Sequence, residues 1–146
     1  MNCLLQVTGR STTLPSEPNE APDITETLTR GICREVGTED GPGYRFDYRV
    51  SEDDNPHNAI SCKVTVSAHK AVIERSGALR STIIVVPGES HSCLYETPYG
   101  ALSFDIYGSE ISLRKEGDSI IASLTYEIYS GGIPTTANEI TITATP

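Results

Sequence analysis

Arg75 is the residue in this sequence that is most suited to a chemical role. Ala71, Ile73 and Arg75 alternate along the chain, so on a strand they share one face, and Arg75 would project toward an apolar interior. A guanidinium there must be paired or solvated, and its planar fork suits a carboxylate or a phosphate. One interpretation is an anchor for an anionic ligand. The other, which the rarity of unpaired buried charges favours, is a brace that pairs with Glu74, Glu96 or backbone carbonyls.

Three tyrosines offer hydroxyl groups that could accompany Arg75. Tyr95 and Tyr99 flank a short connection that contains a proline and ends in a glycine, and the turn alone explains most of this block. Their hydroxyls could also lie at the wet rim of an apolar pocket. Tyr126 lies on the face of its strand that we expect to point inward. The candidate ligand-binding residues are therefore Arg75, Tyr95, Glu96, Tyr99 and Tyr126, and no residue is assigned a catalytic role.

The histidines and cysteines do not predict a metal site. His91 and Cys93 are two residues apart and share a strand face, but zinc sites use three or four protein ligands. His57 and His69 lie in or near separate turns that nothing in the sequence brings together. We expect no metal and no cofactor.

Three further motifs read as turns or strands without a chemical role. Residues 88–92, Gly-Glu-Ser-His-Ser, lack the final glycine of a nucleophile elbow and precede a strand. The glycines of residues 37–43 are not followed by the Lys-Ser/Thr pair of a phosphate loop. The acidic run at residues 52–55 lacks the glycine and the terminal glutamate of a calcium loop, so a solvated turn is the simpler interpretation.

Length and charge limit the classes of protein that remain. The chain has 146 residues, enough for one domain over 1–146 with its own core. Twenty acidic residues against eleven basic ones give a net charge of −9, which disfavours nucleic acids and anionic membranes as partners. No apolar segment reaches the length of a signal or of a membrane span, so we expect a cytoplasmic protein. In that compartment Cys3, Cys33, Cys62 and Cys93 would be free thiols.

The elements that position these residues are strands. Alternation of period two runs through the whole chain, and nine or ten short strands separated by turn signals indicate an all-β sandwich or barrel. The clearest case is 119–129, followed by Gly131-Gly132, Pro134 and a β-branched strand at 140–145, which together predict a hairpin. The apolar parity changes between Ile106 and Ile111, which predicts a bulge near Gly108-Ser109. A Pro-rich mobile loop is expected at 11–22.

Three blocks also carry a resemblance to a known family: residues 75–78 (Arg-Ser-Gly-Ala), 95–100 (Tyr-Glu-Thr-Pro-Tyr-Gly) and 124–128 (Leu-Thr-Tyr-Glu-Ile). In these blocks the chain resembles the YwiB-like family of bacterial proteins, which has no assigned activity. The resemblance implies a single antiparallel meander β-barrel of about 8–10 strands, calycin-like or lipocalin-like. Such a barrel can hold a small ligand, an expectation that rests on analogy of fold.

Three functions remain as hypotheses. The first is non-enzymatic binding of a small anionic or amphipathic ligand in a pocket of about 300 Å³, walled by the inward faces of the last four strands and Arg75. The second is an interaction protein with a filled barrel, which forms a homodimer through an outer face carrying Tyr107, Ile121 and Tyr129. The third is an enzyme acting on a small anionic substrate with Arg75, Glu96 and a tyrosine, which requires these side chains to converge in one cleft.

Overall fold

The computed structural model describes residues 1–15, 21–51 and 59–146. Within these ranges the chain forms ten strands of one antiparallel sheet. The strands are β1 (Asn2–Thr13), β2 (Asp23–Thr38), β3 (Gly41–Val50), β4 (Ile60–Ser67), β5 (Ala71–Gly77), β6 (Ser81–Val85), β7 (Ser90–Thr97), β8 (Gly100–Glu116), β9 (Ser119–Ser130) and β10 (Ile133–Thr145). No helix in the described part of the chain is long and apolar enough to cross a membrane.

The strands form a meander that curls into a nearly closed barrel. Each strand pairs with the next along the chain from β1 to β6 and from β7 to β10, and β10 pairs with β1. Between β6 and β7 the described residues form no continuous ladder. Only two isolated bridges span this seam, Arg80 with Glu96 and Pro87 with Gly108. The predicted all-β antiparallel meander barrel is confirmed, in agreement with the calycin-like form that the resemblance implied.

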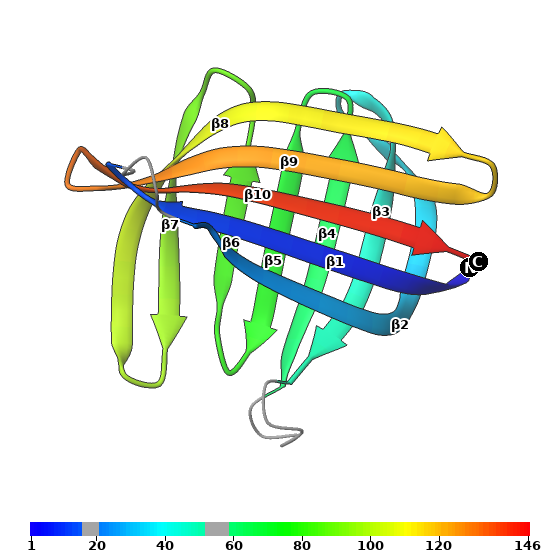
Figure 1. The fold of residues 1–146 in the computed structure, drawn as a ribbon, viewed down its shortest axis with the longest axis horizontal. Coiled ribbons are helices and arrows are strands. Elements are labelled where there is room, and N and C mark those ends of the chain that lie inside the picture. The colour runs from blue at the N-terminus through cyan, green and yellow to red at the C-terminus, as the bar shows by residue number, and fades with distance from the viewer. Residues whose placement is uncertain (16–20, 52–58) are drawn as a thin grey trace.

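The barrel is flattened into two crossing layers (Figure 1). Strands β1, β8, β9 and β10 run across the picture, and β3 to β7 cross behind them. The 16-residue strand β2 joins the layers, because it pairs with β1 from Asp23 to Ile32 and with β3 from Ile32 to Thr38. The part of β2 that precedes Ile32 therefore diverges from β3. A Cβ at Gly31 would clash with the backbone oxygen of Asp47 and the side chain of Leu5, so only glycine fits at this divergence.

Alternation along the strands fills the interior. On β9, Ile120, Ala122, Leu124 and Tyr126 are all buried, as their period predicts. The inward residues of the other strands join them in one apolar core. The largest fully buried members are Phe46, Leu5, Ile73, Ile83, Ile106, Leu124 and Ile142.

Local predictions from the sequence are mostly confirmed. β9 and β10 form the expected hairpin around Gly131-Gly132, both glycines having positive φ. The register of β8 against β9 shifts between Gly108 and Glu110, where the bulge was predicted. Two details were wrong. Pro134 lies inside β10, opposite Tyr129, and residues 11–13 extend β1 instead of beginning a loop.

Candidate functional site

Arg75 lies in a row of inward-facing residues that crosses four neighbouring strands. The register sets Tyr48 of β3 opposite Cys62 of β4, Cys62 opposite Arg75 of β5, and Arg75 opposite Ser81 of β6. Because these residues share the phase of the buried Val64, Ile73 and Ile83, their side chains point into the barrel. The prediction that Arg75 projects inward is confirmed.

Two tyrosines lie near Arg75: Tyr95 of β7, in the same layer, and Tyr126 of β9, in the other layer. The positive charge of Arg75 opposes the rise that burial causes in the pKa values of Tyr95 and Cys62, which places both side chains near the guanidinium. Tyr126, from β9, is only 4% exposed and lies in the electrostatic neighbourhood of Arg75. The ring of Tyr95 packs edge-to-face on Phe104, with centroids 5.4 Å apart and an interplanar angle of 85°, which fixes its position on β7.

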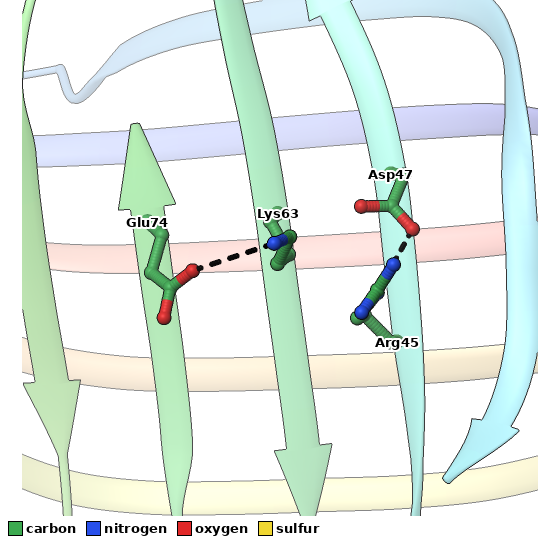
Figure 2. Close-up of polar contacts among 4 residues, drawn as sticks. All are labelled: Arg45, Asp47, Lys63 and Glu74. Atoms are coloured by element: carbon green, nitrogen blue, oxygen red, sulfur yellow. Dashed lines mark hydrogen bonds and ion pairs between the residues drawn. The ribbon is translucent and has the colours of Figure 1, made fainter. Parts of the chain in front are cut away.

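No carboxylate of the described residues forms an ion pair with Arg75. Glu74, which we considered as a brace, points to the outer face, where its Oε2 is 3.9 Å from Nζ of Lys63. Asp47 is likewise held on the outer face by Nε of Arg45, at 3.0 Å from Oδ2. Figure 2 shows these four side chains in front of β3, β4 and β5, with strands of the other layer running behind. The bracing role through Glu74 is therefore wrong.

The electrostatics of the cluster keep Arg75 charged and its neighbours neutral. Burial is the largest single effect and lowers the pKa of the Arg75 guanidinium, but Tyr126, Tyr95, Cys62 and Tyr48 together raise it, and the net shift is upward. Burial raises the pKa of Tyr126 to about 12 and also raises the pKa values of Tyr48 and Cys62, in each case against the opposing effect of Arg75. At neutral pH the cluster therefore carries one uncompensated positive charge.

Ser81 adds an unused hydrogen-bonding group beside this charge. Ser81 is 6% exposed, and its Oγ has no hydrogen-bond partner. A buried hydroxyl without a partner costs free energy comparable to a lost hydrogen bond. Ser81 is the register partner of Arg75 on the next strand, so the two side chains are neighbours on the inner face of the sheet.

A pocket of about 1130 Å³ opens beside this cluster. It lies where β1 and β4 begin, where β3 and β5 end, and where β2 diverges from β3. Arg75, Tyr48 and Cys62 line its inner part, and Leu4 and Ile32 line its outer part. The pocket is larger than the expected 300 Å³, and its walls come from β1 to β5. The inward faces of the last four strands, which we expected to form the walls, are packed into the core.

A second pocket, of about 530 Å³, lies over the seam between β6 and β7. Arg75, Ser81, Arg80 and Glu96 border it. Glu96 is on the exposed face of β7, and among the described residues it forms no ion pair with Arg75. Catalysis by Arg75, Glu96 and a tyrosine would require these side chains to meet, and the carboxylate of Glu96 does not pair with Arg75.

Other residues singled out from the sequence lie apart from the cluster. Tyr99 is 99% exposed in a turn where its backbone N–H donates to Thr97 Oγ1 at 3.2 Å. Nε2 of His91 faces Glu89 at 3.4 Å, and no group of three His, Cys, Asp or Glu suited to a metal occurs in the part of the chain that the structure describes. His57 and the acidic run at 52–55 lie outside the described residues.

The outer-face residues proposed for a dimer do not form one patch. Tyr107 and Tyr129 lie near the same end of the β8–β9 ladder, opposite Glu127 and Asp105 respectively. Ile121 is opposite Arg114, several register steps away along the same ladder.

Sequence reasoning missed Tyr48, Cys62 and Ser81 as members of the Arg75 cluster. Alternation along each strand predicts that these three residues point inward. It does not predict the register between hairpins, which sets them beside Arg75.

The structure thus defines an antiparallel meander barrel with a cationic cluster at one mouth. The family model for a domain of unknown function, DUF1934, matches residues 18–142, and the chain belongs to this family. A crystal structure of the ywiB protein from Bacillus subtilis is similar in fold, with a TM-score of 0.73 at 18% sequence identity, over 99% of this chain and 92% of that one. These findings confirm the YwiB-like resemblance. No curated protein matches the chain.

Proposed function

We propose that this protein binds a small organic anion, with the acidic group held by Arg75 inside the barrel mouth. The observation that carries the proposal is a mostly buried guanidinium that has no carboxylate partner among the described residues and adjoins a pocket. An uncompensated buried charge is costly, and a bound anion removes that cost. Four buried free cysteines support the cytoplasm as the compartment.

The neighbours of Arg75 support binding over catalysis. Ser81 Oγ has a free hydrogen to donate, and the hydroxyls of Tyr48, Tyr95 and Tyr126 stay protonated at neutral pH. Tyr48, which lines the pocket together with Arg75, can donate a hydrogen bond to an oxyanion held there. General acid–base catalysis relies mostly on carboxylates and imidazoles, and the described part of this cluster contains neither.

The proposal is tested by calorimetric titration with octanoate, benzoate and inorganic phosphate at low salt. Octanoate or benzoate is expected to bind to the native protein. Arg75→Gln should weaken that binding about tenfold or more, because a charged hydrogen bond is lost. Arg10→Gln is the matched control, since Arg10 is exposed on β1 and borders neither pocket.

Two results would overturn the proposal. One is that neither organic anion binds to the native protein. The other is that Arg75→Gln and Arg10→Gln bind the anion equally well. Native mass spectrometry of protein purified from its own host provides an independent readout, because a retained acidic molecule should be present in the native protein and absent from Arg75→Gln.

A further inference from the structure

Positive charge is concentrated in the mouth pocket. The chain carries eleven basic residues and a net charge of −9, yet four of the eleven line this one pocket: Arg30, Arg49, Lys63 and Arg75. Two acidic side chains, Asp47 and Glu74, also line it. Asp47 is paired with Arg45 and Glu74 with Lys63, so neither neutralises the pocket's arginines.

Arg30 and Arg49 flank the outer opening of the pocket. The ladder between β2 and β3 ends at Ile32 and Asp47, and its register, continued across the divergence, would set Arg30 opposite Arg49. Both side chains are exposed, and neither forms an ion pair within the described residues. A cleft between low-dielectric walls strengthens the field of such charges.

Apolar side chains also line the pocket, and Leu4 is the register partner of Arg30 on the neighbouring strand. Leu4 and Ile32 are exposed at 46% and 38% although both are large hydrophobic residues, and Cys62 lies deeper. Arg49 on β3 and Arg75 on β5 are two strands apart, which separates their backbones by about 10 Å. The pocket, at about 1130 Å³, is also far larger than an inorganic anion needs.

We infer that the ligand is an organic dianion, in which an apolar segment joins two acidic groups. One acidic group contacts Arg75 inside the barrel, and the other contacts Arg30 and Arg49 at the opening. The apolar segment covers Leu4 and Ile32. This inference rests on the proposed function and adds a second anchoring site and a chemical class to it.

The test compares dicarboxylates with monocarboxylates of equal length: adipate with hexanoate, suberate with octanoate, and sebacate with decanoate. Calorimetry at low salt is expected to give a dicarboxylate advantage of about tenfold at the best length, because one charged contact is added. The double variant Arg30→Gln/Arg49→Gln should lose this advantage while it binds the monocarboxylate within about twofold of the native protein.

The double variant Arg10→Gln/Arg34→Gln is the control. It makes the same change in net charge with exposed arginines of β1 and β2 that do not line the pocket. It should keep the dicarboxylate advantage. Urea unfolding of both double variants checks that the fold is retained, which is expected because all four side chains are exposed.

The inference is overturned if each dicarboxylate binds no more tightly than its monocarboxylate partner, or if the advantage survives in Arg30→Gln/Arg49→Gln. In either case, loss of monocarboxylate binding in Arg75→Gln would leave the proposed function standing. Absence of binding by every carboxylate in the native protein would overturn both.

Discussion

Arg75 and Ser81 are polar groups that the fold places inside without complete partners. The guanidinium lies near a thiol and several phenols but has no carboxylate partner among the described residues, and the Ser81 hydroxyl has no partner. Such groups reduce stability unless a ligand satisfies them. If Arg75 serves to bind a ligand, its removal should not reduce the stability of the ligand-free protein. If Arg75 is a structural brace, its removal should reduce that stability.

Replacing Arg75 by methionine distinguishes these roles. Without ligand, Arg75→Met is expected to leave the free energy of unfolding unchanged or raise it by about 1–2 kcal/mol, because an uncompensated charge is replaced by an apolar chain of similar length. Urea denaturation measures the change, with Arg10→Met as the exposed control. A loss of more than about 2 kcal/mol would instead make Arg75 a structural brace.

At the residue scale the sequence predicted half of the cluster. The phase of Arg75 and the inward positions of Tyr95 and Tyr126 follow from alternation within single strands. The positions of Cys62 and Ser81 beside Arg75 depend on turn lengths that set the register between hairpins, and no local pattern encodes them. For Tyr99, the turn interpretation was correct and the binding interpretation was not supported.

At the scale of the strands, the bulge in β8 brings the two sides of the barrel seam together. This bulge between Gly108 and Glu110 lies where the strand meets the seam, and Gly108 makes two backbone contacts across it. Its carbonyl accepts from the N–H of Gly88 at 2.9 Å, and its N–H donates to the carbonyl of Glu89 at 3.0 Å. A Cβ at Gly108 would collide with the backbone of Val86.

Gly108→Ala is therefore expected to reduce the free energy of unfolding by about 2 kcal/mol or more, since the backbone on both sides must shift. Gly37→Ala is the matched control in β2, because a Cβ at Gly37 meets nothing within 4 Å. That control should be neutral or slightly stabilising. Equal stability of the two variants by urea denaturation would contradict a close approach at the seam.

The elements themselves were the most predictable level. The bulge followed from one change of parity, and the final hairpin from two glycines between alternating segments. The divergence of β2 from β3 was not predictable, because β2 is a single run of sixteen residues without an interruption in its sequence. It depends on the curvature needed to join two layers, and the pocket formed there could not be predicted for the same reason.

The whole molecule buries its thiols and several phenols, and this makes its stability sensitive to alkali. Burial raises the pKa of Cys33 from 9.0 to about 11, with the neighbouring Cys3 adding to the shift, and raises that of Tyr126 from 10.0 to about 12. The folded state thus binds these protons more tightly than the unfolded state. The corresponding stability is complete below about pH 9 and is lost as pH rises toward 12.

Urea unfolding in reducing buffer should show a steep loss of stability between about pH 9 and 12. Tyr126 alone is expected to contribute about 3 kcal/mol to this loss. Tyr126→Phe should remove that contribution, so that its stability curve is flatter than the native one in this range. A native protein with unchanged stability from pH 8 to 11 would contradict the burial of these groups.

The ladder between β1 and β10 has a consequence for how the chain folds. Every other ladder in the described residues joins strands that are consecutive along the chain, whereas this one pairs Leu4 with Thr145 and Thr13 with Thr136. Local hairpins form at low entropic cost, but closing a loop that spans nearly the whole chain is costly and slows folding. Curling ten strands into a barrel thus depends on one late, long-range pairing, and Leu4, at the edge of the mouth pocket, lies within it.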